Sequence, residues 1–414
     1  MVATPQWAGK WEVRIVNPLN ASRRGFLKYL SLSGLGAFIA ACLQQSPSGG
    51  GGGAGGGAAT TAPSAAPGVG GGVASGQTYT WKIQSGWTTA DLFQDQFLAW
   101  KGMVEEMSAG RIKIDALPVN AVTNINDAID AVNSGALDGA HHVPAYYYGK
   151  DHAVSLMGTG PMMGMSGQMW LAWYYYGGGQ ALYEKLVQQK LKLNVVSLFH
   201  MPMWNQPLGW FKEEIKSPDD FKGMKFRTVG LATGIYEGLG ASVISVAGSQ
   251  VAASLDRGAI DAAEFNNTTS DLGYGLPDAR KVLMTRSYHQ PSEILEISLN
   301  KPKYDAMPAD LRAIMKYAAF AESADGEWRQ ISKNSDDYKK LLDRGIKIIP
   351  TPQSVLDAQL RAWNTVIEKE SKDNADFVAI LNSQKAWAQK VYPWADAITI
   401  RTPDKTSYDF FIKK

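Results

Sequence analysis

The sequence predicts an α/β fold of two similar lobes, followed by long helices towards the C-terminus. From Tyr79 onward, short strand-like apolar runs alternate with stretches of helical periodicity. A ten-residue pattern at 131–140 recurs about 120 residues later, at 254–263. The C-terminal part is rich in Ala, Lys, Glu and Leu at helical spacing. Strand–helix alternation of this kind favours a mostly parallel sheet covered by helices.

The first group of elements lies between residues 80 and 143. A strand is expected at 80–84, where apolar and polar residues alternate, and a helix at 92–107. A second strand at 111–114, a short helix at 125–132 and a third strand at 136–143 follow. Further strands are predicted at 195–199, 225–228, 243–246, 260–265 and 294–299, and long helices at 308–342 and 354–392.

The repeated pattern is a helix end, a glycine and a new strand. It reads Ala-Val-Asn-Ser-Gly-Ala-Leu-Asp-Gly-Ala at 131–140 and Ser-Leu-Asp-Arg-Gly-Ala-Ile-Asp-Ala-Ala at 254–263. A polar or aromatic cluster follows each strand, at 141–148 and 264–271. Because ligands of open α/β sheets bind beyond the carboxyl ends of strands, two facing lobes would bring both clusters to one cleft. Chance is the alternative, since glycine after a helix is common.

The first 42 residues have the parts of an export signal. Ser-Arg-Arg-Gly-Phe-Leu-Lys at 22–28 precedes an apolar run from Tyr29 to Ala41, which is too short to span a bilayer. The paired arginines resemble a twin-arginine signal, and Ile-Ala-Ala-Cys ending at Cys42 resembles a lipobox. We expect a twin-arginine lipoprotein signal at 1–42 with lipidation of Cys42. The alternative is an amphipathic helix with a buried cysteine.

Residues 43–77 are expected to be a flexible linker. They are almost entirely Gly, Ala, Ser, Pro and Thr, without aromatic or charged residues, so they cannot bury enough surface to fold. Their reach would be roughly 30–35 Å. A folded body starting near Tyr79 would then stay close to its lipid anchor, on the periplasmic or extracellular face of the cytoplasmic membrane.

Composition and motifs exclude several classes of function. The chain of 414 residues carries 41 Lys and Arg against 39 Asp and Glu. This balance gives no footprint for nucleic acid and no polybasic membrane surface. The single cysteine cannot form an internal disulfide. No His-Glu-x-x-His, Walker-type loop or Gly-x-Ser-x-Gly occurs, so we do not expect an enzyme, although catalytic groups can be scattered.

Several segments, taken in order, resemble the solute-binding proteins of TRAP transporters, which are tripartite importers of organic acids. The resemblance covers about 79–400 and is closest to the branch that binds 2-oxo or 2-hydroxy monocarboxylates together with a metal ion. It rests on Tyr146 to Asp151, Trp173 to Leu182, Gln206 before Gly209-Trp210-Phe211, Lys225-Phe226-Arg227 and Gly258 to Glu264.

The resemblance implies a two-lobed, periplasmic-binding-protein-like fold with a hinge. Lobe 1 would comprise 79–201 with about 288–328, and lobe 2 would comprise 202–287 with about 329–400. Some relatives form homodimers through a long C-terminal helix. The segment 354–392 has the length for such a helix, but packing on its own lobe is equally consistent with the sequence.

Arg227 is the residue expected to hold a carboxylate. It ends a predicted strand, shortly before Gly230. Arginine offers a planar, always-charged fork of donors that pairs with a carboxylate through two hydrogen bonds. The alternative from the residues alone is a surface arginine in a salt bridge. The resemblance favours the binding role.

Gln206, Glu264 and the backbone carbonyl of Phe265 are implied by the resemblance as ligands of Na⁺ or Ca²⁺ that bridges to the substrate. Hard cations prefer carboxylate, amide and backbone oxygens. Glu264 lies in an otherwise apolar run, where an unpaired carboxylate would be costly to bury. The related branch usually has tryptophan at the Phe265 position. The alternatives are a solvated strand-end acid for Glu264 and a loop amide for Gln206.

Other residues are expected to line the cleft. Trp87 follows the first strand, and Tyr146 and Tyr147 follow the third, with the ring that faces the ligand left open. Asn266, with Asn267, would bind a ligand or cap a turn. His289 would line the hinge or pack as a structural residue. The adjacent His141 and His142 face opposite sides of a strand, so we expect them to be structural.

The function expected from these features is capture of a small organic acid in the cleft and delivery to separate small and large membrane permease subunits. A second hypothesis is a ligand sensor that docks onto a membrane receptor kinase. A third, a lipid-anchored hydrolase, would require turnover of the bound ligand.

Overall fold

The computed structural model describes residues 76–399 and 405–412. The signal expected at 1–42, with Cys42, and nearly all of the linker expected at 43–77 lie outside the described residues. Within the described ranges, no helix combines the length and apolar character needed to cross a bilayer.

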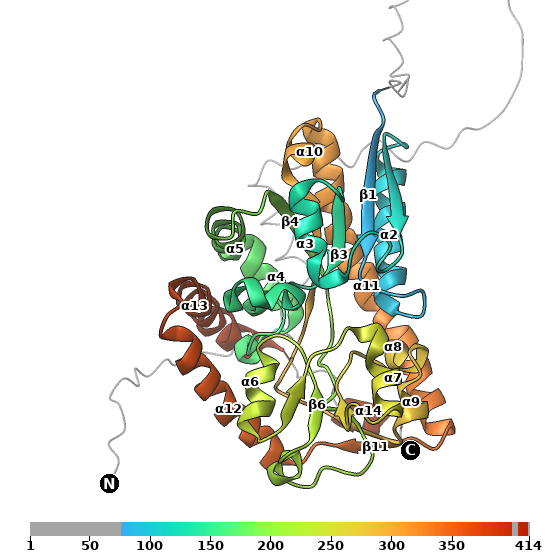
Figure 1. Ribbon diagram of the computed structural model, residues 1–414, viewed down its shortest axis with the longest axis vertical. Helices are drawn as coiled ribbons and strands as arrows, with labels where there is room; N and C mark the ends of the chain where they lie inside the picture. The colour runs from blue at the N-terminus through green and yellow to red at the C-terminus, as the bar shows by residue number, and fades with distance from the viewer. Residues whose placement is uncertain (1–75, 400–404, 413–414) are drawn as a thin grey trace, which may run out of the picture. The chain divides into compact units, whose positions relative to one another are not determined.

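Two mixed β-sheets organise the fold (Figure 1). The first sheet contains β1 (Tyr79–Ser85), β2 (Ile112–Leu117), β3 (Gly139–His142), β4 (Val195–Pro202) and β10 (Ile294–Asn300), in the order β2-β1-β3-β10-β4. The second sheet contains β5 (Gly209–Phe211), β6 (Lys225–Arg227), β7 (Ser242–Ile244), β8 (Ala262–Ala263), β9 (Val282–Thr285) and β11 (Lys347–Pro350), in the order β11-β9-β5-β8-β6-β7.

The α/β class is confirmed, and so is the expectation of mostly parallel strands, although each sheet contains one reversed strand. Strands β1, β2 and β3 pair in parallel, whereas β10 runs antiparallel to both of its neighbours. In the second sheet, β5 runs antiparallel to β8 and β9. The chain enters β5 from the first sheet and β10 from the second. Strands β5 and β10 therefore start at the edge of the sheet where the parallel strands end, and they run in the opposite direction to those strands.

Thirteen α-helices surround the sheets within the described ranges. They are α2 (Leu92–Met107), α3 (Ala128–Ser134), α4 (Gly167–Tyr176), α5 (Gly179–Glu184), α6 (Ala232–Gly238), α7 (Val251–Asp256), α8 (Thr268–Gly273), α9 (Leu276–Ala279), α10 (Lys301–Asp305), α11 (Ala309–Asp343), α12 (Gln353–Ser371), α13 (Ala375–Ile398) and α14 (Lys405–Phe411). Short 3-10 and π turns lie between them, at η2 (Ile125–Asp127), η3 (Pro144–Lys150), η4 (His152–Met157), η5 (Met162–Gly164), η6 (Lys185–Lys190), η7 (Pro218–Phe221) and η8 (Gly248–Gln250).

The alternation in β1 has a direct packing consequence. Trp81 and Ile83 are fully buried, and they form one apolar cluster with Phe97 and Trp100 of α2 and Met315 of α11. The N-terminus of α2 is capped by Asp91, whose carboxylate accepts a hydrogen bond from the Phe93 amide at 2.9 Å. Sequence pattern and cap therefore agree on where this helix begins.

The repeated pattern forms the same structure twice. Helix α3 ends at Gly135, which has a left-handed φ of 81°, and β3 follows. Helix α7 is followed by Gly258, with a φ of 69°, and then by β8. Because a left-handed residue after a helix favours glycine, the recurrence in the sequence marks two equivalent helix ends.

The expected long helix at 308–342 is confirmed by α11, but the single helix expected at 354–392 is wrong. The chain breaks at 372–374, and the Asn374 side chain caps α13 by accepting from the Phe377 amide at 3.0 Å. Helix α12 packs on α6, whereas α13 packs on α4, α5 and η4. The lobe boundaries given above stay predictions.

Helix α11 runs past both sheets (Figure 1). Near its start, the Met315 carbonyl accepts from Trp100 Nε1 at 3.2 Å. Further along, the Asn334 carbonyl accepts from Thr268 Oγ1, at the start of α8, at 2.9 Å. One rigid element therefore contacts both halves of the folded body.

Two glycines give a matched test of backbone crowding. Gly209 has a φ of 142°, and an added Cβ would lie 2.6 Å from the Ala263 carbonyl oxygen across the β5–β8 pair. Gly102 lies in α2, and an added Cβ would meet no atom within 4 Å. We expect Gly209→Ala to lower the free energy of unfolding by about 2 kcal/mol and Gly102→Ala to raise it by about 0.5–1 kcal/mol. Urea denaturation measures both, and equal effects would contradict the packing described here.

Candidate functional site

Three side chains expected at the site meet where strands of the second sheet begin and end. Arg227 ends β6, Glu264 directly follows β8, and Gln206 lies just before β5. Since β5 is antiparallel to β8, its beginning lies beside the end of β8. The reversed strand therefore brings Gln206 next to Glu264, although they are 58 positions apart.

Arg227 and Glu264 form a buried ion pair. The Arg227 Nη1 donates to Glu264 Oε1 at 2.9 Å and lies 3.3 Å from the Glu264 carbonyl oxygen. The guanidinium Nε donates to the Val246 carbonyl at 3.1 Å. The two side chains are only 2% and 1% exposed. No acceptor for Nη2 is found among the described residues.

Gln206 completes a small group of oxygens around Glu264. Its Nε2 lies within hydrogen-bond distance of Glu264 Oε2 and of the Phe265 carbonyl oxygen, the latter at 2.5 Å. Its Oε1 is buried and has no hydrogen-bond partner. An amide can turn either end inward. The group thus offers a carboxylate, a backbone carbonyl and an amide oxygen, which is the donor set that hard cations prefer.

The charge on Glu264 is held in a dry environment. Burial raises the pKa of the Glu264 carboxyl above its usual range, and the Arg227 guanidinium opposes that rise. An additional cation beside this carboxylate would favour its ionised form further. Within the described ranges, no three His, Cys, Asp or Glu side chains cluster as a metal site. The group around Glu264 has one carboxylate and otherwise neutral oxygens.

A cavity of about 480 Å³ adjoins the ion pair. Val246, whose carbonyl holds Arg227, lines it together with Val229, Gly230, Tyr146 and Tyr148. Its remaining lining is mainly polar and neutral: Asn124, Asn126, Ala145, Gly149, Thr233, Ser245, Ala247 and Gln250. The cavity thus has room for a small molecule and no charged lining residue of its own.

The structure separates the two tyrosines that the sequence left unresolved. Tyr146 lines the cavity, and its ring lies 5.8 Å from that of Trp87. Tyr147 points into the core, where its hydroxyl donates to Glu296 at 2.5 Å. It is therefore not brought to the cavity, because the η3 turn directs consecutive side chains to different sides.

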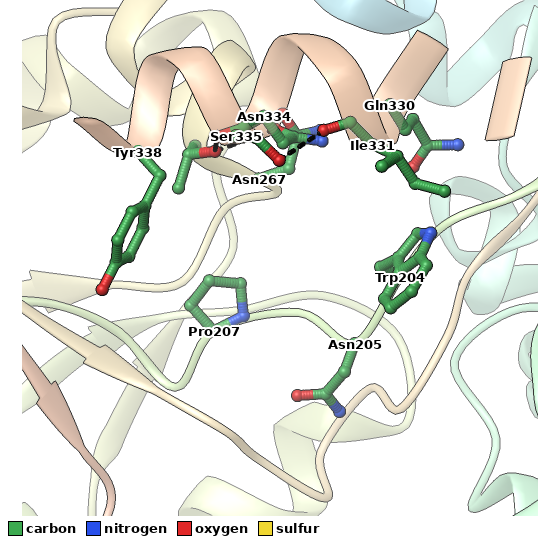
Figure 2. Close-up of a pocket in the computed structure, with 10 residues that line it drawn as sticks. Trp204, Asn205, Pro207, Asn267, Gln330, Ile331, Asn334, Ser335 and Tyr338 are labelled. Atoms are coloured by element: carbon green, nitrogen blue, oxygen red, sulfur yellow. Dashed lines mark hydrogen bonds between the residues drawn. The ribbon is translucent and has the colours of Figure 1, made fainter. Parts of the chain in front are cut away.

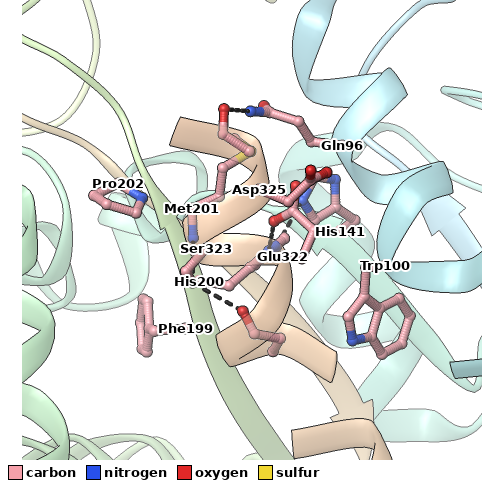
Figure 3. Close-up of polar contacts among 12 residues, drawn as sticks. Gln96, Trp100, His141, Phe199, His200, Met201, Pro202, Glu322, Ser323 and Asp325 are labelled. Atoms are coloured by element: carbon pink, nitrogen blue, oxygen red, sulfur yellow. Dashed lines mark hydrogen bonds and ion pairs between the residues drawn. The ribbon is translucent and has the colours of Figure 1, made fainter. Parts of the chain in front are cut away.

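Trp87 is held by a chain of buried polar groups, of which Figure 3 shows His141, His200 and Glu322. Its Nε1 donates to His141 Nδ1 at 3.1 Å. The two Nε2 atoms of His141 and His200 are 3.1 Å apart, and His200 Nδ1 lies 2.7 Å from Glu322 of α11.

Only one arrangement of protons satisfies this chain with both rings neutral. His141 Nδ1 must accept, so its Nε2 carries the proton and donates to His200, whose Nδ1 then donates to Glu322. Burial, with the neighbouring His200, lowers the pKa of His141 well below its usual value, which favours the neutral form. The expectation that His141 and His142 are structural agrees with their complete burial.

Phe265, Asn266 and His289, the other residues expected at the site, are also buried. Phe265 packs edge-on against Tyr274, with ring centroids 4.7 Å apart. The Asn266 amide donates to Asp271, and Asn267 caps α8, so capping accounts for the second asparagine. His289 is fully buried beside Ser287, with its Nε2 unpartnered.

A second buried carboxyl was missed by the sequence reasoning. Glu293 precedes β10, and its Oε2 accepts from Gln290 Nε2 at 2.5 Å while its Oε1 has no partner. Burial and the nearby Glu264 charge raise its pKa to about 8. No motif spacing connects Glu293 with Gln206 or Glu264. The antiparallel entry of β10 brings it there.

The two halves touch closely around the site. An added Cβ on Gly230 would lie 2.7 Å from Thr159 Oγ1, and one on Gly273 would lie 2.4 Å from the Ala90 carbonyl oxygen. Ser270 Oγ donates to Asp91 at 2.8 Å. Arg227, Glu264 and Gln206 are all buried beside this contact.

Comparison with known proteins matches residues 84–373 to the family described as bacterial extracellular solute-binding protein, family 7. A curated relative, the monocarboxylate 2-oxoacid-binding periplasmic protein of Nostoc sp., is 29% identical over 291 residues, which cover 70% of this chain and 79% of that protein.

Solved structures share the fold. A TRAP periplasmic solute-binding protein from Colwellia psychrerythraea with bound calcium and pyruvate has a TM-score of 0.72 and 27% identity, covering 81% of this chain and 100% of that chain. One from Pseudoalteromonas atlantica with bound sodium and pyruvate has a TM-score of 0.72 and 28% identity, covering 78% and 97%.

The burial of His289 predicts a pH dependence of stability. Burial lowers its pKa from 6.5 to about 3, so the unfolded chain binds the proton first as pH falls. The stability that neutral His289 contributes is present above about pH 6.5 and decreases towards pH 3. It should be on the order of 3 kcal/mol lower at pH 4 than at pH 7.

Comparing the wild type with His289→Gln isolates this contribution, because buried acids such as Glu293 affect both proteins equally. The free energy of unfolding, measured by denaturation at pH 4 to 7, should fall less steeply in the variant. Parallel curves would exclude the assigned burial effect.

Proposed function

This chain belongs to the bacterial extracellular solute-binding proteins of family 7, and on that premise we propose that it captures a 2-oxo or 2-hydroxy monocarboxylate for a TRAP-type importer. It is a TRAP solute-binding protein for small organic acids, and its cargo is delivered to small and large membrane permease subunits. The observation that carries the proposal is the buried Arg227–Glu264 pair with Gln206, next to a cavity of about 480 Å³.

Arg227 binds the ligand carboxylate. Its Nε and Nη1 are engaged by Val246 and Glu264, which fix the plane of the guanidinium and leave Nη2 for the ligand. A charge-assisted hydrogen bond in this dry setting is stronger than one at a surface. Tyr146, which lines the cavity and packs on the ring of Trp87, gives the ligand site an apolar side that favours a short organic chain over a hydrated ion.

Gln206, Glu264 and the Phe265 carbonyl hold a Na⁺ or Ca²⁺ ion that bridges to the ligand. The unpartnered Gln206 Oε1 fits this role, because a buried amide oxygen without a partner is costly unless a donor or a cation approaches it. Arg227 and Glu264 balance each other, so a monocarboxylate and a monovalent cation would enter together without leaving net charge in the site.

Capture is coupled to closure of the two halves. At Gly230 beside Thr159 and at Gly273 beside Ala90, the halves approach too closely to admit an added Cβ. Ligand binding would add contacts available only in the closed form and shift the population towards it. Asn266 and His289 are buried and do not line the cavity. They position the chain segments that carry Phe265 and Gln290.

The chain works outside the cytoplasmic membrane, tethered to it by a lipid on Cys42 after export through a twin-arginine signal. The motif at 22–42 and the uncharged segment 43–77 support this part of the proposal. Tethering would raise the local concentration of the loaded protein at its permease.

Neither alternative role has a specific observation in its favour. A sensor for a receptor kinase would need the same capture step, and no feature of the described residues distinguishes a kinase partner. The family consists of substrate-binding transport proteins, and the site described here contains donors for a ligand and no activated nucleophile. We therefore propose that the chain is not an enzyme.

The carboxylate clamp predicts a specific loss with Arg227→Lys. Lysine keeps the charge beside Glu264 but lacks the fork of donors, so pyruvate should bind about 10- to 100-fold more weakly. Isothermal titration calorimetry measures this change. Arg257→Ala, an exposed arginine after α7, is the matched control and should leave the affinity unchanged. Unaltered affinity of Arg227→Lys for the best-bound acid would rule out the clamp.

The cation role predicts that metal and ligand binding are lost together. After dialysis against a chelator in sodium-free buffer, pyruvate affinity should fall and then recover on addition of Ca²⁺ or Na⁺. Glu264→Gln should reduce both the amount of bound metal and the affinity for pyruvate. Inductively coupled plasma mass spectrometry measures the bound metal. Glu237→Gln, an exposed acid of α6, is the control. Tight pyruvate binding by the metal-free protein would contradict this assignment.

A further inference from the structure

The ligand cavity is larger than the smallest acids that the site can hold. Its volume is about 480 Å³. Even if each non-hydrogen atom of lactate or pyruvate took the volume of a water molecule in the liquid, about 30 Å³, the anion would fill at most about 180 Å³. Such an ion, held by Arg227, therefore leaves more than half of the cavity free, and a longer cargo can fill that space.

A separate groove does not add to this space. It lies beside α11, and Figure 2 shows Trp204, Pro207 and Tyr338 around it. No described residue lines both the groove and the ligand cavity. A cargo that is longer than pyruvate must therefore find its additional contacts among the residues that line the ligand cavity itself.

Two segments lead from the carboxylate clamp to the mouth of the cavity. Gly230, three residues after Arg227, lines the cavity and is buried, whereas Thr233 at the start of α6 lines it and is only partly buried. Val246, whose carbonyl accepts from Arg227 Nε, is partly buried, whereas Gln250 at the end of η8 is exposed. The burial of the lining therefore decreases along both segments with distance from the clamp.

The mouth of the cavity is lined by neutral hydrogen-bonding side chains. Its exposed members are Asn124, Asn126, Ser245 and Gln250, and the partly buried Thr233 adds a hydroxyl group. Asn124 Oδ1 caps the η2 turn, where it accepts from the Asn126 amide at 3.0 Å. No hydrogen bond found within the described ranges uses the side chains of Asn126, Thr233, Ser245 or Gln250. Each of these four side chains can donate and accept, so they suit a neutral group that does the same.

A second charge on the cargo would have no partner at this mouth. None of the described lining residues is a lysine, an arginine or a histidine. Lys150, which follows the lining residue Gly149, is bonded to Asp130 at 2.7 Å. The exposed acid Asp127 adjoins Asn126 and would repel a second carboxylate. A dicarboxylate would therefore lose hydration without gaining a cation. An amide or a hydroxyl group would exchange its hydrogen bonds to water for hydrogen bonds to these side chains.

We propose that the cargo is a 2-oxo or 2-hydroxy monocarboxylate longer than pyruvate, with a neutral amide or hydroxyl group at its far end. Arg227 holds the carboxylate, and Asn126, Thr233 and Gln250 bind the far end. This inference rests on the proposed function, since it concerns the other end of the same ligand. It adds to that function a selection against dicarboxylates and against purely apolar chains.

Isothermal titration calorimetry with four 2-hydroxy acids tests this assignment. Lactate has no far end. The amide acid 2-hydroxyglutaramate ends in a neutral hydrogen-bonding group, 2-hydroxyglutarate ends in a carboxylate, and 2-hydroxy-5-methylhexanoate ends in an apolar group of the same shape. In the presence of Ca²⁺ and Na⁺, the amide acid should bind at least about 10-fold more tightly than the other three, because two additional hydrogen bonds of ordinary net strength give about that factor.

Two variants test the residues at the mouth. Gln250→Leu and Thr233→Val remove a hydrogen-bonding group while nearly keeping the size of the side chain. Each should lower the ratio of the affinity for 2-hydroxyglutaramate to the affinity for lactate by about 3- to 10-fold. Gln189→Leu, which changes an exposed glutamine of η6 that does not line the cavity, is the matched control and should leave both affinities unchanged.

The outcomes separate this inference from the proposed function. Equal binding of 2-hydroxyglutaramate and the apolar acid, or tighter binding of 2-hydroxyglutarate, overturns the inference, while binding of lactate or pyruvate still supports the proposed function. An unchanged affinity ratio in both Gln250→Leu and Thr233→Val overturns it as well. Failure of every acid, pyruvate included, to bind the wild type contradicts the proposed function and this inference with it. Circular dichroism shows whether each variant is folded, and the acid series on the wild type remains decisive if one is not.

Discussion

The buried ion pair between Arg227 and Glu264 is the constraint on which the arrangement of the site depends. Two charges removed from water are costly unless their attraction and further hydrogen bonds compensate the loss of hydration. The pair is only 2% and 1% exposed, so its surroundings must supply that compensation. The Val246 carbonyl and the Gln206 amide do so in part. Gln206 Oε1 still has no hydrogen-bond partner, and a ligand or a cation can supply the missing interaction.

The path of the chain between the two sheets explains why these groups meet. The parallel strands β6 and β8 end beside the site, so residues after them reach it directly. The crossing strands β5 and β10 begin there, so residues before them reach it too. The same reversal that makes the sheets mixed therefore gathers Gln206, Arg227, Glu264 and Glu293 from four separate segments. Sheet topology and site composition have a single cause.

Support for the site extends well beyond the residues that line the cavity. The chain from Trp87 through His141 and His200 to Glu322 connects the ring that packs on Tyr146, a cavity-lining residue, with α11. Helix α11 in turn contacts α2 on one side and α8 on the other. The element that spans both halves therefore also fixes, through Glu322, the position of the Trp87 ring.

The sequence by itself determined the α/β class, the repeated helix–glycine–strand unit and the long helix α11, because periodicity and left-handed glycine are local properties; the candidates Arg227, Gln206 and Glu264 came from its resemblance to a known family. It did not separate Tyr146 from Tyr147, place the break before Asn374 or find Glu293. Three features depend on contacts between residues far apart in the chain. They are the side of the η3 turn that a ring faces, the residue at which a helix ends against α4 and α5, and the strand that runs antiparallel to its neighbours. Only the tertiary structure decides them, since their energy comes from packing and desolvation that exist only once both halves are assembled.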